Sequence, residues 1–526
     1  MIYRSPFPDV DIPQVALPHL VLEAAAQRGD KPALIDGPTG RTISYALLDR
    51  AVQRVAAGLH ERGFSQGDVF AIYSPNLPEY VVVFLAVAQL GGTVTTVNPL
   101  YTANELTQQM RSAGARAMIT VPPLLPAARQ AAAEAGLDEV FVFGEGEGAT
   151  PFAALMSTDG VAPRVEIAAD DVVVLPYSSG TTGLPKGVLL THHNLVANLT
   201  QIDGLQGHVY AEVGEDDVLL GLLPFFHIYG MTVIMLYSLM RGATVVTMPR
   251  FDLEQFLQFR QQYGITYANV VPPIIMALAK HPLVDQYDMS GLRGLMSGAA
   301  PMGAAVARLA AERLGCAVMQ GYGMTELSPV SHTNPDDPDT IDMASVGPPI
   351  PNTECRLIDV GTGEDVGPGQ PGELLVRGPQ VMRGYLNDPD ATAATLDDDG
   401  WLHTGDIAVV DERGYFTIVD RVKELIKYKG YQVAPAELEA LLVTHPDIAD
   451  VAVVGSPDED AGEVPKAFVV AAGDLSTDEV MAFVAERVAP YKKVRKVEFV
   501  SEIPKAASGK ILRRDLIAKE RSATGV

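Results

Sequence analysis

The chain has 526 residues, of which 47% are hydrophobic and 7% aromatic, and its formal net charge is −26. This length favours three or four domains, and the composition is that of a globular protein with enough apolar residues for large cores. The strong acidity argues against nucleic acid or an anionic membrane as the main partner.

The two cysteines, Cys316 and Cys355, have neither a pairing nor a metal-binding spacing, which favours a reducing compartment such as the cytoplasm. We expect no signal peptide, lipidation signal or membrane span. Two apolar stretches, 80–97 and 218–240, are interrupted by polar residues, glycine or proline. We interpret them as a buried helix with a strand, and as a strand, loop and buried helix.

Apolar runs alternate with helical patterns three times along the first 410 residues. The first series predicts strands at 68–74, 93–99 and 116–121 and helices at 78–92 and 102–114, where Thr102 and Glu105 are spaced as a capping box and Gly114 ends the helix. The second predicts strands at 243–248 and 265–271 and helices at 252–264, with Asp252 as N-cap, and 273–280. The third predicts strands at 292–298 and 316–323 around a helix at 302–315. Such alternation is typical of mostly parallel sheets covered by helices.

The pattern changes twice in the last third of the chain. From about 340 to 420, short alternating strands lie between Pro/Gly turns and predict a small β-rich subdomain. From 421 to 526 a lysine-rich loop and a helix at 436–444 follow, with 16 Lys+Arg against 17 Asp+Glu. We predict a domain boundary near Asp420–Arg421. The fold class is therefore α/β, with a large N-terminal domain (1–420) and a small mobile α+β C-terminal domain (421–526).

The loop from Ser178 to Gly187, "SSGTTGLPKG", cannot pack a core. Two serines, two threonines, three glycines and a lysine between two strands supply hydroxyls, backbone N–H groups and one cation, which suit a polyanion such as a triphosphate. A flexible surface turn is the plainer interpretation. Pro185 stands where a Walker loop has glycine before lysine, so an ordinary P-loop is disfavoured.

Other polar residues follow strands, where ligands bind in open α/β sheets. His227 in "PFFHIYG" lies among aromatic residues and is either a functional group or a core histidine. Tyr322 in "QGYGMTE" has room for a flat ring, and Glu326 is either a Mg²⁺ ligand or a capping carboxylate. Asp406 in "GWLHTGD" suits two sugar hydroxyls or an Asx-turn.

In order, "SSGTTGLPKG", "PFFHIYG", "QGYGMTE", "GWLHTGD", "DRVKELIKYKG" and "PKAASGK" resemble the motifs of adenylate-forming acyl-CoA synthetases, and the likeness covers nearly the whole chain. Within that superfamily, "ELIKYKGYQVAPAELEALLVTHPDIADVAVVG" and "FHIYG" are most similar to the 4-coumarate–CoA ligase branch. Six ordered motifs are a specific signal, whereas each one alone is weak.

The resemblance implies two steps. A carboxylate attacks the α-phosphorus of Mg·ATP to give acyl-AMP and pyrophosphate, and the thiol of coenzyme A then displaces AMP. Because the first step joins two anions, catalysis depends on positioning and charge neutralisation. The resemblance places the β- and γ-phosphates on Ser178, Ser179, Gly180, Thr181, Thr182 and Lys186.

The resemblance also implies that adenine binds to Gln320, Gly321 and Tyr322, in a pocket walled by Gly298 and Ala299. Thr325 is expected to contact the α-phosphate and Glu326 to bind magnesium. The ribose hydroxyls are expected to bind to Asp406 and Arg421. His227 is expected to orient the carboxylate, and Lys510 in "SGK" to bridge it to the α-phosphate. Lys423 resembles a hinge. After rotation about it, Lys427 and Gln432 are expected near the adenylate and Lys429 and Gly430 at the coenzyme A entrance, while Arg250 meets the coenzyme's phosphates.

The acyl pocket implied by the resemblance is lined by Tyr229, Val233, Met296, Gly298, Ala299, Gly321, Pro329 and Val330, with Lys423 and Lys427 near the adenylate. Val233 replaces a small hydroxyl residue expected there, and Leu327-Ser328 replaces alanine-glycine, so we expect a bulkier, drier pocket. Because one buried methylene contributes only about 0.8 kcal/mol, such changes shift preference rather than abolish activity. Cinnamates without ring hydroxyls and medium- or long-chain fatty acids stay open beside 4-coumarate.

Three other functions are weighed against an ATP-dependent acyl-CoA ligase acting in the phenylpropanoid class. An adenylating enzyme could use another acceptor, as carrier-protein-loading domains and luciferases do. A nucleotide-binding regulator would bind ATP without turnover. "GFSQG" at 63–67 fits a serine-hydrolase pattern but lies between a helix and a strand, the wrong context. The acid, the pathway and the choice between monomer and homodimer are not set by the sequence.

Overall fold

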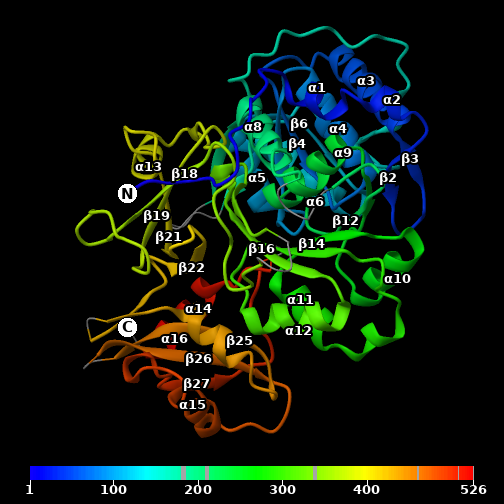
Figure 1. Cartoon of the computed structure of the whole chain (residues 1–526). Helices are drawn as coiled ribbons and strands as arrows, with labels where there is room; N and C mark the ends of the chain where they lie inside the picture. The colour runs from blue at the N-terminus through cyan, green and yellow to red at the C-terminus, as the bar shows by residue number, and fades with distance from the viewer. Residues whose placement is uncertain are drawn as a thin grey trace.

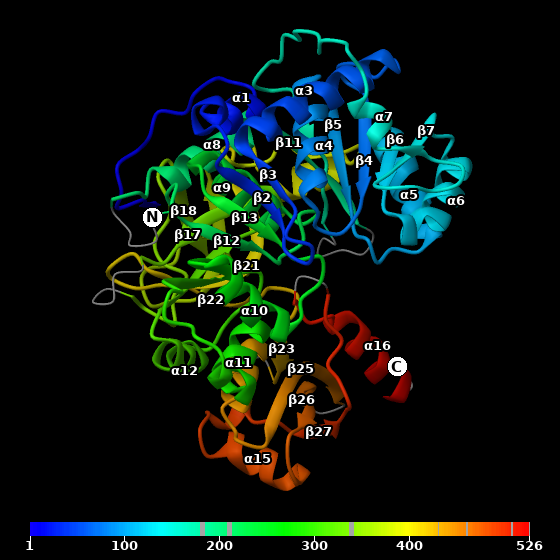
Figure 2. The same cartoon turned by 90° about the vertical axis from the view of Figure 1, so that its right-hand side faces the viewer.

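The computed structural model of the chain describes residues 1–178, 185–207, 213–335, 341–429, 431–458, 461–506 and 509–524, without the side chains of Gln432 and of 521–524. A large body, blue to yellow in Figure 1, carries a smaller domain, orange to red, at one end. Figure 2 shows the same arrangement from the side, with the smaller domain below the green helices.

Two mostly parallel sheets form the large body. The first contains β4 (Val69–Tyr73), β5 (Thr93–Val97), β6 (Ala115–Thr120), β7 (Glu139–Val142), β8 (Thr150–Pro151), β9 (Val172–Val174), β10 (Tyr177–Ser178), β11 (Lys186–Thr191) and β20 (Gly384–Tyr385). The second contains β2 (Pro32–Asp36), β3 (Thr42–Ser44), β12 (Val218–Gly221), β13 (Thr244–Thr247), β14 (Tyr267–Val270), β15 (Gly294–Ser297), β16 (Ala317–Gly323) and β17 (Val330–Thr333). Antiparallel pairing is confined to edges such as β2–β3, β16–β17 and β10–β11.

The helices of the large body cover these sheets. They are α1 (Leu17–Leu22), α2 (Ala25–Arg28), α3 (Tyr45–Glu61), α4 (Pro78–Gln89), α5 (Ala103–Ala113), α6 (Leu125–Ala135), α7 (Ala153–Met156), α8 (His192–Asp203), α9 (Tyr237–Arg241), α10 (Leu253–Tyr263), α11 (Pro272–Lys280) and α12 (Ala304–Leu314), with short helices η1 (Pro122–Leu124), η3 (Pro282–Gln286), η4 (Thr325–Leu327) and a π-helix η2 (Tyr229–Leu236).

Helix α4 explains one of the two long apolar stretches. It is apolar on every side, and it contacts β4 and β5 of the first sheet and β2 of the second. A helix with no polar face needs such burial. One core cluster accordingly runs through both sheets. Among the described residues, no helix combines the length and apolar composition needed to cross a bilayer.

The strand–helix alternation predicted from the sequence is confirmed, including its local signals. Helix α5 begins at a capping box of Thr102 and Glu105 and ends at Gly114, whose φ is 64°. Asp252 caps α10 by accepting a hydrogen bond from Gln255 N. The stretch 218–240 is a strand, a loop and buried helix, as expected, although most of the helix is of the π type.

The β-rich subdomain is an antiparallel sheet with the strand order β1-β18-β19-β21-β22 and its own core. Its strands are β1 (Tyr3–Arg4), β18 (Glu354–Ile358), β19 (Gly372–Arg377), β21 (Leu402–Val410) and β22 (Phe416–Arg421), and α13 (Pro389–Thr395) packs beside it. The N-terminal strand β1 joins β18, a pairing that the sequence did not indicate. Strand β22 ends at Arg421, while the boundary near Asp420–Arg421 stays a prediction.

The C-terminal domain has its own sheet and two small cores. It contains β23 (Ile426–Tyr428), β24 (Tyr431–Val433), β25 (Ile448–Asp458), β26 (Gly462–Ala471) and β27 (Lys496–Phe499), with α14 (Pro435–Leu442), η5 (Pro490–Lys492), α15 (Thr477–Ala485) and α16 (Arg513–Thr524). Helix α14 ends two residues before the predicted Thr444, where a turn takes over: Thr444 N bonds Leu441 O.

Candidate active site

A cavity of about 880 Å³ lies where the two parallel sheets, the β-rich sheet and the C-terminal domain meet. Many of the residues expected from the sequence line it, although they come from segments far apart in the chain. They are Ser178, His227, Tyr229, Val233, Met296, Gly298, Ala299, Gly321, Tyr322, Thr325, Glu326, Pro329, Val330, Arg421, Lys423 and Lys510.

The glycine-rich loop connects β10 to β11, and Ser178 of β10 pairs with Lys186 of β11. Ser179, Gly180, Thr181 and Thr182 lie outside the described residues. At the start of β11, the Lys186 ammonium lies 3.7 Å from Asp388 and 5.2 Å from the centre of the Tyr385 ring. Lys186 and Ser178 therefore stand at the two ends of the loop, with the cation close to the cavity-lining Tyr385.

Glu326, on η4, is 4% exposed. Its Oε1 accepts hydrogen bonds from Ser178 Oγ at 3.0 Å and from Tyr385 OH at 2.9 Å. Within the described ranges, no group of three or more His, Cys, Asp or Glu side chains could hold a metal ion. The Glu326 carboxylate lines the cavity and suits Mg²⁺ that arrives on substrate phosphates, because Mg²⁺ keeps several non-protein oxygen ligands.

Asp406 lies behind Tyr322 and is almost fully buried. The Tyr322 hydroxyl donates to Asp406 Oδ2 at 2.6 Å, and Arg421 Nε lies 3.2 Å from Oδ1. Burial raises the pKa of Asp406, and Arg421 and the Tyr322 hydrogen bond oppose that shift. Burial and the Asp406 charge raise the pKa of Tyr322 well above its ordinary value, so Tyr322 stays a donor.

Gln320 does not reach into the cavity with its side chain. Its amide donates to Met302 O at 3.1 Å and Met343 O at 2.7 Å, and accepts from Met302 N at 3.1 Å. All of these partners are backbone groups of neighbouring loops. Gln320 thus ties two loops together beside Gly321 and Tyr322, which do line the cavity.

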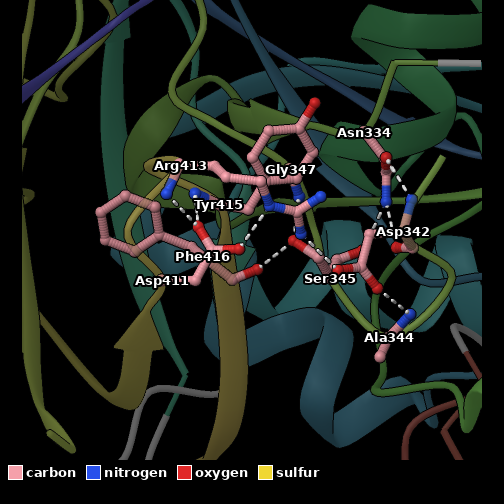
Figure 3. Close-up of polar contacts among 9 residues, drawn as sticks. All are labelled: Asn334, Asp342, Ala344, Ser345, Gly347, Asp411, Arg413, Tyr415 and Phe416. Atoms are coloured by element: carbon pink, nitrogen blue, oxygen red, sulfur yellow. Dashed lines mark hydrogen bonds and ion pairs between the residues drawn. The ribbon is translucent and has the colours of Figure 1, made fainter. Parts of the chain in front are cut away.

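The loop that carries Met343 is anchored to the β-rich sheet by the network in Figure 3. Asn334 Nδ2 donates to Ser345 O at 2.9 Å and also to Asp342 O. Arg413 Nη2 donates to Asp342 Oδ2 at 2.8 Å, and Ser345 Oγ donates to Phe416 O at 2.6 Å. These bonds fix the wall next to Gln320 from two sides.

His227 is half-buried at the start of the turn that leads into η2. Its Nδ1 accepts a hydrogen bond from Tyr229 N at 3.3 Å, so the neutral ring carries its proton on Nε2. Burial and the nearby positive charge of Lys510 lower the pKa of His227 to about 4. Near neutral pH the ring is therefore an uncharged donor that lines the cavity.

Lys510 reaches the cavity from a tight hairpin in which Lys505 pairs with Ile511 and Ala506 N bonds Lys510 O. Burial and the charge of Arg421 lower the pKa of Lys510 to about 8, while Glu424 and Asp406 favour its ammonium form. Adjacent Gly509 has a φ of 78°, and a Cβ there would lie 3.0 Å from Val271 Cγ2. The hairpin thus packs directly on the residues that begin α11.

The residues expected to serve the second step lie elsewhere. Lys427, Lys429 and Arg250 are exposed and do not line the cavity. Lys427 N donates to Glu463, and the Lys429 ammonium lies 5.9 Å from the centre of the Tyr428 ring. Gly430 and the Gln432 side chain lie outside the described parts of the chain.

Tyr385 and Glu424 are among the cavity-lining residues that the sequence reasoning did not name. Tyr385 contacts Glu326 because β20 pairs with β11, where Tyr385 lies opposite Val188. No local sequence pattern predicts that pairing. Glu424 favours the charged form of Lys510. Its position between the cations Lys423 and Lys427 of "DRVKELIKYK" was a usable signal.

Comparison with known proteins agrees with this geometry. A model of the AMP-binding enzyme family matches residues 21–386, and one of the AMP-binding enzyme C-terminal domain matches residues 437–510. The chain is 44% identical to 4-coumarate–CoA ligase 3 of Oryza sativa subsp. japonica, over 100% of this chain and 96% of that protein.

Two solved structures share the fold. ATP-bound MatB from Rhodopseudomonas palustris has a TM-score of 0.88 at 29% sequence identity, and the match covers 97% of this chain and 100% of the MatB chain. The anthranilate CoA ligase AuaEII in complex with anthranoyl-AMP has a TM-score of 0.90 at 25% identity, with 98% and 99% covered. The chain therefore belongs to the AMP-binding enzyme family of the adenylate-forming superfamily, and within it the chain is similar to the 4-coumarate–CoA ligase branch.

Proposed function

We propose that the protein is an AMP-forming acid–thiol ligase that joins a hydrophobic aromatic carboxylic acid to coenzyme A at the expense of ATP. One observation carries the proposal. Lys510 from the C-terminal domain and His227, Glu326 and Arg421 from the large body line one cavity. They supply a cation, a neutral donor, a buried carboxylate and a guanidinium backed by Asp406, which are the groups that adenylation of a carboxylate needs.

In the first step an oxygen of the carboxylate attacks the α-phosphorus of ATP, and the bond from that phosphorus to the pyrophosphate oxygen breaks. His227, neutral because its pKa is about 4, donates from Nε2 to the acid and orients it. Lys510 places its ammonium between the carboxylate and the α-phosphate, where Thr325 also contacts the phosphate. Positioning and charge neutralisation together lower the barrier between two anions.

The nucleotide rests on both sheets. Lys186 and the hydroxyl-rich hairpin hold the β- and γ-phosphates, and Gly321 and Tyr322 receive adenine. Asp406 and Arg421 hold the ribose hydroxyls, for which the Tyr322–Asp406 hydrogen bond keeps the carboxylate in place. Glu326 would hold Mg²⁺ together with phosphate oxygens; the ion would neutralise charge on the leaving pyrophosphate.

In the second step the sulfur of coenzyme A attacks the acyl carbon, the carbon–oxygen bond to AMP breaks, and the thiol proton is released. The C-terminal domain turns about Lys423 between the steps. That turn withdraws Lys510 and brings Lys427 and Gln432 to the adenylate, with Lys429 and Gly430 at the coenzyme entrance and Arg250 on its phosphates. The present posture, with Lys510 in the cavity and Lys427 exposed, suits the first step.

The acid lies among Tyr229, Val233, Met296, Ala299, Gly321, Pro329 and Val330. A Cβ on Gly298 would come 2.7 Å from Cε1 of the Tyr229 ring, so glycine leaves that ring its place against the wall. A flat aromatic acid fits beside it, and a medium- or long-chain fatty acid is the second candidate. We further propose domains 1–420 and 421–526, a cytoplasmic location, and a monomer or homodimer.

The test is a product analysis of the purified chain with ATP, Mg²⁺, coenzyme A and a panel of cinnamates, benzoates and fatty acids. We expect acid-dependent release of AMP and pyrophosphate and a thioester with an aromatic acid. ADP and orthophosphate would overturn the proposal. Adenylate formation without thioester would point to another acceptor, and ATP binding without pyrophosphate release would point to a regulator.

A further inference from the structure

Tyr385 lies between two groups that the proposed reaction needs. Its hydroxyl group donates to Glu326 Oε1 at 2.9 Å, and the ammonium group of Lys186 lies over its ring, 5.2 Å from the ring centre. A cation at that distance from an aromatic ring is attracted to the face of the ring. One half-buried side chain therefore makes two different contacts, a hydrogen bond through its hydroxyl group and a cation–π contact through its ring.

The pairing of β20 with β11 puts Tyr385 in this place. Leu386 N donates to Gly187 O at 2.8 Å, so a backbone hydrogen bond joins the residues that directly follow Tyr385 and Lys186. On the other side, Tyr385 N donates to Thr392 Oγ1 of α13 at 2.9 Å. The backbone that carries the ring is therefore held both by the strand that carries Lys186 and by the helix beside it.

The hydroxyl contact determines how the Glu326 carboxylate is turned. Ser178 Oγ donates to the same oxygen, Oε1, at 3.0 Å. Two donors on Oε1 fix the rotation of the carboxylate and leave its other oxygen, Oε2, for a ligand in the cavity that Glu326 lines. Burial, followed by the charge of Glu326, raises the pKa of Tyr385, so the phenol keeps the proton that it donates.

The ring contact determines where the Lys186 ammonium group lies. Lys186 also lies 3.7 Å from Asp388, which caps α13 by accepting a hydrogen bond from Ala391 N. A lysine side chain is flexible, and the ring and the carboxylate together hold its ammonium group beside the cavity that Tyr385 lines. A triphosphate carries more negative charge than Asp388 and can replace it as the partner of the ammonium group, whereas the uncharged ring does not compete.

We propose that Tyr385 is a positioning residue for ATP, which holds Glu326 and Lys186 at a fixed spacing so that Mg²⁺ and the phosphates it accompanies meet both groups together. The inference rests on the proposed function, because it concerns the same nucleotide site. The two contacts have different roles. The hydroxyl group serves Mg²⁺ through Glu326, and the ring serves the phosphates through Lys186.

Equilibrium binding separates the two contacts without turnover. Calorimetry in the absence of an acid substrate gives Kd for ATP with Mg²⁺ and Kd for ATP with EDTA. Tyr385→Phe keeps the ring and removes the hydroxyl group, so we expect Kd for Mg·ATP to rise about tenfold and Kd for metal-free ATP to stay within about twofold. Tyr385→Leu removes the ring as well, and we expect Kd for metal-free ATP to rise about threefold in addition.

Tyr263→Phe is the matched control. The Tyr263 hydroxyl group donates to Gly37 O at 2.7 Å, and Tyr263 does not line the cavity, so neither Kd should change. Adding Tyr385→Phe to Glu326→Gln should raise Kd for Mg·ATP little further, because the hydroxyl group acts through that carboxylate. A Tyr385→Phe variant with the wild-type Kd for Mg·ATP, or one in which both constants rise equally, would overturn the inference. So would effects of the two substitutions that multiply.

The outcomes also separate this inference from the proposed function. If the wild type binds Mg·ATP and releases pyrophosphate with an acid, while Tyr385→Phe binds both forms of ATP as the wild type does, the role of Tyr385 is wrong and the ligase function stands. If the wild type binds ATP in neither condition, the proposed function fails, and the inference with it. Tyr385→Phe decides the inference even if Tyr385→Leu does not fold.

Discussion

The hydroxyl group of Tyr322 donates a 2.6 Å hydrogen bond to Oδ2 of Asp406. The other carboxylate oxygen lies 3.2 Å from Arg421 Nε, at the last residue of the β-rich sheet. The residue proposed to face adenine and the residue proposed to hold the ribose are thus one connected unit. The second parallel sheet and the β-rich sheet meet at this hydrogen bond.

Asp406→Asn tests this unit, because the amide keeps the shape and loses the charge that Arg421 faces. We expect KM for ATP to rise by about tenfold or more, since hydrogen bonds to charged groups contribute about 1.5–3 kcal/mol, with a smaller change in KM for the acid. Steady-state pyrophosphate release measures both constants. Asp398→Asn, on an exposed loop, is the control, and an unchanged KM for ATP in Asp406→Asn would argue against ribose binding here.

The lowered pKa of Lys510 predicts that the rate of adenylation depends on pH. Its pKa is lowered to about 8 by burial and by Arg421, so the free enzyme loses the ammonium as the pH rises through that value. The kcat/KM for adenylation should therefore fall above about pH 8 by up to tenfold per unit. The pKa of His227, about 4, predicts no second change between pH 6 and 7.

Lys510→Arg separates this ionisation from others, because a guanidinium stays charged over the range. The variant should be slower than the wild type but should show no decline between pH 7.5 and 9.5. Pre-steady-state adenylate formation at each pH is the measurement. A decline of the same size in the arginine variant would assign the ionisation to another group.

Gly509→Ala tests how tightly the C-terminal hairpin must pack. The substitution strains a backbone with a φ of 78° and places a methyl group 3.0 Å from Val271. We expect adenylation to fall about tenfold, while thioester formation from supplied acyl-AMP changes little. Gly363→Ala has a similar φ of 72° and no atom within 4 Å of the new Cβ, so it carries the strain without the contact. Equal effects of the two variants would attribute the loss to strain alone.

Glu326→Gln tests the proposed magnesium ligand. The amide oxygen can still accept from Ser178 and Tyr385, but the negative charge is gone. The Mg²⁺ concentration for half-maximal pyrophosphate release should rise by about tenfold or more, because Mg²⁺ prefers carboxylate oxygens. Exposed Glu312→Gln removes the same charge from α12 and should leave the titration unchanged. An unaltered titration in Glu326→Gln would make this carboxylate a structural acceptor only.

Much of the fold followed from local patterns, because the signals were strong and short in range. The Thr102–Glu105 capping box, the Asp252 cap and the apolar α4 each determine their own helix. Sheet edges are different. Strand β1 pairs with β18 about 350 residues away, and a two-residue strand has no periodicity to read.

The site divides in the same way. The order of the motifs predicted that His227, Tyr322, Glu326 and Lys510 belong to one site, and all four line the cavity. Tyr385 was missed because its contact with Glu326 arises only when β20 pairs with β11. The expectation of a bulkier, drier pocket, drawn from Val233 and from Leu327-Ser328, stays a prediction.

The central claim is that Lys510 acts in adenylation and is withdrawn before thioester formation. Measuring both half-reactions in Lys510→Ala and Lys427→Ala tests it most directly. Lys510→Ala should lose acyl-AMP formation by about a hundredfold or more yet convert supplied acyl-AMP and coenzyme A at near the wild-type rate, and Lys427→Ala should show the reverse. Equal losses in both half-reactions for either variant would contradict a domain that presents different lysines in the two steps.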